Sequence, residues 1–82
     1  DAGVEAGLPA DLATRLADAT VSGAGELLRT SDLDAATLRK NVTSPGGTTE
    51  AALRVLMGDD GLPEKMTQAV AAATRRGKEL AD

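Results

Sequence analysis

The sequence contains no cysteine, no histidine and no aromatic residue. The lack of Cys and His excludes disulfides, thiol nucleophiles, Ser-His triads and zinc sites. There is no aromatic residue to stack on a nucleic-acid base, and a net charge of −4 lacks the positive footprint that nucleic acids and anionic membranes require. No apolar run approaches the roughly 18 residues of a membrane span. We therefore expect no nucleic-acid partner and no membrane association, and the absence of cysteine fits a cytoplasmic location.

The missing aromatic residues also limit the hydrophobic core. Each Phe, Tyr or Trp would bury about 150–250 Å², whereas the apolar residues here, 41% of the chain, are mostly Ala, Leu and Val. A chain of 82 residues with such small side chains offsets its ordering entropy only marginally. We therefore expect closely packed helices and a core shared with a second copy, in a homodimer or a higher homo-oligomer.

Apolar residues recur at helical spacing, and no segment alternates with the period of a strand. The pattern predicts an all-α fold, a small bundle of four to five helices that interlocks with a second chain. The predicted elements are the end of a helix over residues 1–7, helices over 9–30 and 35–42, a helix from Thr48 or Thr49 to Met57, and a last helix starting near Pro63. The chain begins without Met, inside a helical pattern, and we interpret it as part of a longer protein.

Local signals set the ends of these helices. Gly7 suits the position after a helix C-terminus, and Pro9 suits the first turn of the next helix, followed by Asp11. The helix over 35–42 can be capped by Ser31, Asp32 or Asp34. The turn between the last two helices is predicted at Gly58-Asp59-Asp60-Gly61.

The predicted helix over 9–30 carries almost no side chain over Ser22-Gly23-Ala24-Gly25. A glycine inside a helix costs about 1 kcal/mol relative to Ala. The compensation we expect is another backbone pressed close to this face, and the alternative is a helix break at Gly25.

The stretch Ser44-Pro45-Gly46-Gly47-Thr48-Thr49 leads directly into a predicted helix. Glycines let a ligand approach the backbone, and the helix N-terminus presents unpaired N–H groups with partial positive charge. The hydroxyls of Ser44, Thr48 and Thr49 add donors, so the stretch is a candidate site for a carboxylate or phosphate. No Lys follows the glycines, which excludes a P-loop. The alternative is a plain Pro-Gly turn with a Thr N-cap.

Other charged residues carry less chemistry. Asp32 with Asp34, and Asp59 with Asp60, would need several further ligands to hold a cation, so we predict no metal site. No acidic residue is embedded in an apolar run that would make it a general acid or base. Arg39 and Lys40 precede the glycines and could attract an anion, but we interpret them, like Arg75, Arg76 and Lys78, as solvent-exposed.

Residues 38–53, Leu-Arg-Lys-Asn-Val-Thr-Ser-Pro-Gly-Gly-Thr-Thr-Glu-Ala-Ala-Leu, resemble the signature of pyrroline-5-carboxylate reductase. The flanks, Asp1-Ala2-Gly3-Val4 to Pro9 and Ala69-Val70 to Leu80, resemble its carboxy-terminal domain in the same order. The resemblance implies an enzyme that reduces 1-pyrroline-5-carboxylate to L-proline with NADPH or NADH. It further implies that residues 1–82 form the helical dimerisation domain with a substrate-binding loop at 43–49. The N-terminal dinucleotide-binding domain is absent from this chain, so the chain alone is expected to hold no cofactor and to be inactive.

The resemblance also implies residue roles. The backbone N–H groups of Gly47, Thr48 and Thr49 would hold the substrate carboxylate, with Ser44 nearby. Thr49 matches the threonine that contacts the ring nitrogen, and is the candidate catalytic residue. Val42 would line the pocket or belong to the core. The sequence departs from many relatives at Asp59-Asp60-Gly61, which affects a turn and not the loop.

Two other functions compete with this interpretation. The first is a non-catalytic helical dimerisation or interaction module in which residues 44–49 form only a capped turn. The second is a helical domain of another Rossmann-linked dehydrogenase, such as a β-hydroxyacid type. Those enzymes place a catalytic Lys on a long helix, and none of the three lysines here, Lys40, Lys65 and Lys78, has a convincing context.

Overall fold

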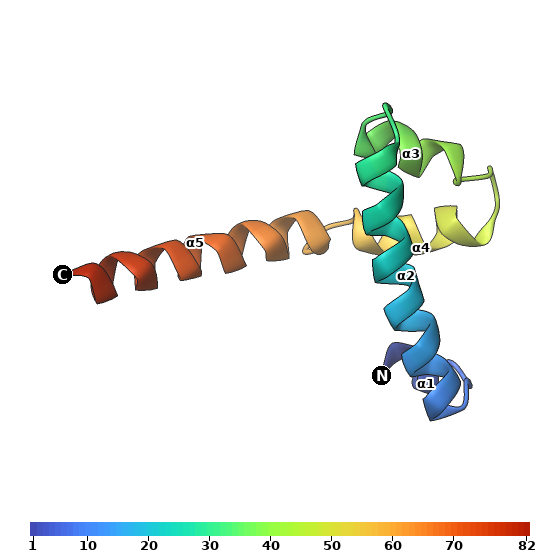
Figure 1. Ribbon diagram of the computed structural model, residues 1–82, viewed down its shortest axis with the longest axis horizontal. Coiled ribbons are helices and arrows are strands. Elements are labelled where there is room, and N and C mark those ends of the chain that lie inside the picture. Colours follow the sequence, from blue (N-terminus) through green and yellow to red (C-terminus); the bar gives the residue numbers. More distant parts are fainter. The chain divides into compact units, whose positions relative to one another are not determined.

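In the computed structural model, which describes residues 1–82, the chain forms five α-helices and no strand. In order these are α1 (Ala2–Glu5), α2 (Ala10–Thr30), α3 (Ala35–Asn41), α4 (Thr48–Leu56) and α5 (Leu62–Ala81) (Figure 1). The all-α prediction is confirmed. The chain divides into two compact units, Asp1–Leu38 and Arg39–Asp82.

The first helix ends in a turn that depends on Gly7. Its φ of +109° lies in the region that favours glycine. The N–H of Gly7 donates to the carbonyl of Val4, and the N–H of Leu8 donates to the carbonyl of Gly3, both at 3.0 Å. These two bonds satisfy carbonyls at the helix end in the pattern of a Schellman motif. The predicted role of Gly7 is confirmed.

Helix α1 lies against the beginning of α2 (Figure 1). A Cβ atom on Gly3 would lie 3.3 Å from the Cβ of Ala13, so the two helices approach through a residue without a side chain. Ala13 is the single buried hydrophobic residue of the chain. The first unit therefore has a contact point in place of an extended core.

Helix α2 begins one residue later than the proline suggested. Pro9 is the N-cap, with φ −58° and ψ 144°, and its carbonyl accepts the N–H of Ala13 at 2.9 Å. Our placement of Pro9 inside the first turn was wrong, because its extended ψ leaves it as the half-helical residue that only accepts the first bond. Asp11 lies in the first turn, as predicted.

Helix α2 continues through both of its interior glycines without interruption. The alternative of a break at Gly25 is therefore wrong. A Cβ added to Gly23 or Gly25 would meet nothing within 4 Å. Nothing within the first unit makes the close approach that these glycines suggested, so an approach by another backbone stays a prediction.

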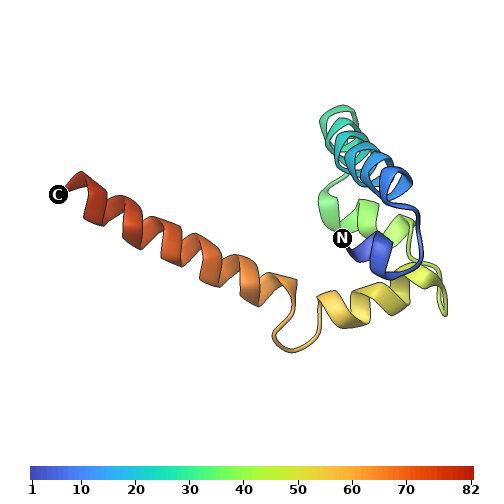
Figure 2. The ribbon, with the colours of Figure 1, turned by 90° about the horizontal axis from the view of Figure 1, so that it is seen from below.

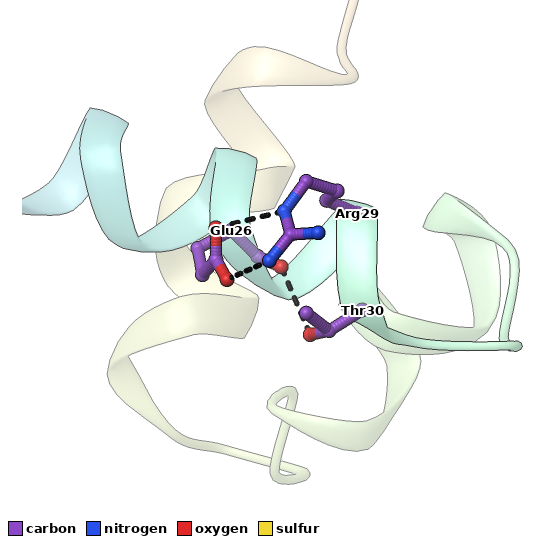
Figure 3. A network of polar contacts seen from close by, with 3 residues as sticks. All are labelled: Glu26, Arg29 and Thr30. Carbon is purple, nitrogen blue, oxygen red and sulfur yellow. Dashed lines mark hydrogen bonds and ion pairs between the residues drawn. The ribbon is translucent and has the colours of Figure 1, made fainter.

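The last turn of α2 carries a polar network of three residues (Figure 3). Arg29 donates to both carboxylate oxygens of Glu26, from Nη2 at 2.6 Å and Nε at 3.1 Å. The Thr30 hydroxyl donates to the Glu26 carbonyl at 2.9 Å. The Arg29 guanidinium holds the pKa of Glu26 below its ordinary value. Because both side chains are largely exposed, the pair adds little to stability.

Asp34 caps helix α3, which resolves the choice among three predicted caps. Its Oδ1 accepts the N–H of Thr37 at 2.8 Å, while the Ser31 hydroxyl accepts the N–H of Leu33 at 3.1 Å in the preceding turn. The hydrogen bonds from Thr37, through its side chain and its backbone, hold the pKa of Asp34 below its ordinary value.

The turn between α4 and α5 is as predicted, and its shape explains its two glycines. Asp60 has a φ of +58°. A Cβ on Gly58 would lie 2.7 Å from the carbonyl oxygen of Arg54, and one on Gly61 would collide with the carbonyl of Leu56. Helix α5 then starts with Pro63 in its first residues, as predicted, and runs unbroken to its end (Figure 2).

Almost every large apolar side chain is exposed to solvent. Val21 and Val55 are each 75% exposed, Val42 is 64% exposed, and no hydrophobic side chain larger than Ala13 is buried. Val42 is thus not part of a core in this chain. The expectation that 82 residues without aromatics build little core of their own is confirmed, whereas interlocking with a second chain stays a prediction. None of the helices has the length and hydropathy to cross a membrane.

Candidate anion-binding site

The predicted binding loop joins α3 to α4 within the second unit. At the end of α3 the Thr43 hydroxyl donates to the carbonyl of Arg39 at 2.6 Å, and the Thr43 N–H donates to the carbonyl of Lys40 at 3.1 Å. These bonds satisfy the last carbonyls of α3 and fix the point where the loop begins.

Two glycines of the loop shape a tight turn in different ways. Gly46 has a φ of +73°, which favours a residue without Cβ. Gly47 donates its N–H to the Ser44 carbonyl at 2.9 Å, and a Cβ there would lie 3.1 Å from that same oxygen. The turn therefore brings the backbone of residues 44–47 together directly before the start of α4.

Helix α4 opens with three free backbone donors. Gly47 is the N-cap, and the first helical bond runs from the N–H of Ala51 to its carbonyl at 3.2 Å. The N–H groups of Thr48, Thr49 and Glu50 have no acceptor within the chain. The alternative of a Thr N-cap is wrong, since Gly47 takes that position and has no side chain with which to cap. A helix end of this kind carries partial positive charge and binds anions.

The three predicted hydroxyl groups are brought to this helix end. Thr48 and Thr49 begin α4, and Ser44 precedes it in the turn. None of these side chains has a hydrogen-bond partner within the chain, and Thr49 is half-buried while Ser44 and Thr48 are exposed. The predicted residues therefore lie in the turn and the first turn of α4, and their hydroxyls are uncommitted. Gly47 differs from the prediction in one respect, because its N–H is already used in the turn.

An ion pair on the first turns of α4 was missed by the sequence reasoning. Arg54 Nη2 lies 2.7 Å from Glu50 Oε1, and the Glu50 side chain is 33% exposed. Glu50 is the third residue of α4, so its side chain extends from the same first turn that carries the free N–H groups. The Glu-x-x-x-Arg spacing is the signal that was available in the sequence.

The basic residues before the loop do not reach it. Arg39 and Lys40 are exposed, as predicted, and Arg39 Nη1 contacts the Met57 sulfur at 3.9 Å. A shallow hollow on α5, lined by Pro63, Glu64, Thr67 and Gln68, contains none of the predicted site residues. No three acidic side chains gather as metal ligands. The anion site thus depends on α4 itself.

Comparison with known proteins places the whole chain. A family model described as pyrroline-5-carboxylate reductase dimerisation matches residues 1–80. Pyrroline-5-carboxylate reductase of Pseudomonas aeruginosa is 42% identical over 82 residues, which is 100% of this chain and 30% of the relative. The enzymes of that name from Synechocystis and Pisum sativum are each 45% identical over 80 residues, or 98% of this chain, and cover 30% and 29% of the relatives.

The matched model and the five helices define an all-helical dimerisation domain. The chain belongs to the pyrroline-5-carboxylate reductase family, in its dimerisation domain. It spans about 30% of the length of the curated relatives that it matches. The competing prediction of a domain from a β-hydroxyacid-type dehydrogenase is thereby wrong.

Proposed function

We propose that this chain is the carboxy-terminal part of an enzyme that reduces 1-pyrroline-5-carboxylate to L-proline with NADPH or NADH. In this proposal residues 1–82 supply dimerisation, and residues 43–49 supply the substrate-binding loop. The nucleotide is held by an amino-terminal domain outside this chain, and the enzyme works in the cytoplasm. The observation that carries the proposal is the set of three free N–H groups at the start of α4, on Thr48, Thr49 and Glu50. The first two of these residues belong to the Pro-Gly-Gly-Thr-Thr stretch that resembles the family's signature.

The substrate carries one carboxylate, and the loop offers matching donors. The N–H groups of Thr48 and Thr49 are free, and the hydroxyls of Ser44 and Thr48 are uncommitted. Gly47 contributes space, since it presents no side chain where a carboxylate would approach. Hydrogen bonds to a charged acceptor contribute about 1.5–3 kcal/mol each, so two or three such bonds suffice to orient a small substrate.

Thr49 is the candidate catalytic residue. Its hydroxyl has no partner within the chain and its side chain is half-buried, which leaves it free to contact the ring nitrogen. There it would orient the imine or help to supply its proton. Because the hydride comes from the nucleotide, the task of this domain is to place the substrate and stabilise charge.

Dimerisation is supported by what the chain leaves uncovered. Its one buried hydrophobic residue is Ala13, while sixteen large apolar side chains are exposed, among them Leu16, Leu28 and Val70. Burying Val or Leu contributes about 1.5–3 kcal/mol per side chain. A homodimer or higher homo-oligomer would supply the core that the single chain lacks.

The alternative is a non-catalytic helical dimerisation module whose loop binds no substrate. The deciding experiment is nucleotide oxidation by the full-length protein that carries this domain, with NADPH and with NADH. Oxidation that requires 1-pyrroline-5-carboxylate establishes the reductase. A folded oligomer that oxidises neither nucleotide in the presence of that substrate leaves only the dimerisation module.

A further inference from the structure

We propose that Arg54 is a positioning residue, which draws the Glu50 carboxylate away from the free N–H groups of α4 and so keeps the anion site open. The inference rests on the proposed function, because it requires an anionic substrate at these N–H groups. It concerns a residue outside the loop motif, one helical turn further along α4.

A glutamate at the third position of a helix is a natural competitor for an anion site. In a capping box such a side chain folds back and binds the N–H of the N-cap residue. Its carboxylate is also attracted to the partial positive charge of the helix end. Glu50 holds this position, and it carries the same chemical group as the substrate. Because it is tethered beside the donors, its local concentration would exceed that of any free substrate.

The structure has Glu50 turned to a different partner. Its Oε1 accepts a hydrogen bond from Arg54 Nη2 at 2.7 Å, and it accepts none from the first turn of the helix. The N–H of Gly47, which a capping box would use, is bonded to Ser44 instead. Arg54 lies four residues toward the C-terminus, so the ion pair pulls the carboxylate away from the helix end.

No other cation is paired with Glu50. Arg54 is the sole ion-pair partner of Glu50, and Arg39 contacts the Met57 sulfur. An acid placed four residues before a base is also the favourable orientation for a helix pair. Removal of Arg54 therefore leaves the Glu50 carboxylate without its partner and free to be drawn toward the partial positive charge of the helix end, where the substrate carboxylate would bind.

The test is steady-state kinetics of the full-length reductase with 1-pyrroline-5-carboxylate. For Arg54→Gln we expect the KM for this substrate to rise about three- to tenfold, as one solvent-screened charge within a few ångströms of the ligand would produce, with kcat changed less than about twofold. Arg54→Lys keeps a cation within reach of Glu50 and should retain the wild-type KM. The dissociation constant of L-proline should follow the same order.

A double variant separates this role from a simple loss of positive charge. With Glu50→Gln in place there is no carboxylate to release, so adding Arg54→Gln should leave KM near that of Glu50→Gln alone. Equal effects of Arg54→Gln in both backgrounds would overturn the proposal. Arg76→Gln is the matched control, since Arg76 forms an exposed pair with Glu79 on α5.

The outcomes distinguish the two proposals. A wild-type protein that reduces no substrate overturns both. An active wild type whose KM is unaffected by Arg54→Gln overturns only the role of Arg54. If Arg54→Gln fails to assemble, Arg54→Ala takes its place in both backgrounds: a raised KM that Glu50→Gln abolishes supports the role of Arg54, and an equal effect in both backgrounds overturns it.

Discussion

The N–H of Gly47 donates to the carbonyl oxygen of Ser44 at 2.9 Å, and a Cβ atom on Gly47 would lie 3.1 Å from the same oxygen. The turn thus closes through the backbone and leaves little room for a side chain. Gly46 serves another purpose: its φ of +73° favours glycine, although the space around it is open. Gly46 sets the direction of the backbone, and Gly47 lets the turn close on the Ser44 carbonyl.

This difference sharpens the expected effect of a side chain at Gly47. Gly47→Ala should raise the KM of the full-length enzyme, and Gly47→Val should raise it by at least about tenfold, since the loss of one or two charged hydrogen bonds costs that much. Gly46→Ala strains the backbone without filling the site, so it is the matched control. Wild-type KM in Gly47→Val, with the dimer intact by light scattering, would contradict the carboxylate site.

Thr49→Ala should lower kcat/KM by about tenfold or more, because a hydroxyl that bonds a charged group is lost from the reacting complex. Thr49→Ser should retain most activity. The Thr49 hydroxyl has no partner within the chain, so neither variant should change the melting temperature or the oligomer. Unchanged kinetics in Thr49→Ala would mean that this hydroxyl contacts no substrate.

The exposed apolar faces predict that the 82-residue chain associates with itself. Sedimentation should give a dimer or larger oligomer, and its Tm should rise with protein concentration. Val70→Lys, on the apolar stripe of α5, should weaken association by about tenfold or more, the equivalent of one buried Val. Gln68→Lys on the same helix is the control. A stable folded monomer would contradict the shared core.

Gly23 offers a test of whether a second backbone approaches α2. In a free helix Gly23→Ala should stabilise by about 1 kcal/mol, and within this chain the added Cβ meets nothing within 4 Å. We nevertheless expect Gly23→Ala to weaken the dimer, because a close helix crossing has no room for the methyl group. Ser22→Ala adds no bulk and serves as control. A stabilised dimer in Gly23→Ala would show that the glycine face stays open.

Asp34 gives a pH dependence whose sign follows from its cap. Hydrogen bonds from Thr37 lower the pKa of Asp34 in the folded state. The stability that the charged Asp34 contributes is therefore fully present above the ordinary pKa of an aspartate, about 4. That contribution is lost as the pH falls through the lowered value in the folded state. The difference in denaturation midpoint between wild type and Asp34→Ala should be largest at neutral pH and shrink in acid. An equal difference at pH 7 and well below pH 4 would contradict the charged cap.

Much of the fold was predictable because its determinants are local. Gly7 ends α1 and Asp34 caps α3 through bonds to residues a few positions away, and Pro63 suits the start of α5 because its missing N–H costs nothing there. The errors are also local: Pro9 lies one residue outside its helix, and Gly25 does not break α2. Propensity alone cannot decide the latter, because continuous hydrogen bonding along 21 residues outweighs single glycine penalties.

The sequence was sufficient to predict which residues form the candidate site. It was not sufficient to predict which of their N–H groups are free to bind an anion. The motif located Ser44, Gly47, Thr48 and Thr49 at the start of α4. That the N–H of Gly47 is consumed by Ser44, while that of Glu50 is free, depends on the geometry of the turn. The orientation of Glu50 toward Arg54 is likewise a choice of rotamer, which residue spacing permits but does not determine.

The threonines of the two long helices, α2 and α5, affect how the surfaces of these helices would pack against a second chain. In α2 and α5 five threonine hydroxyls donate to the carbonyl four residues earlier, at 2.7–3.2 Å: Thr14, Thr20, Thr30, Thr67 and Thr74. Each hydroxyl is therefore satisfied before any contact is made. When such a side chain is buried against a partner, its hydroxyl donor loses no hydrogen bond to water, and its methyl group is available for apolar contact. Toward a helix that packs on α2 or α5, each of these threonines therefore behaves much like a valine. The surfaces of the two helices are more apolar than their amino-acid composition indicates.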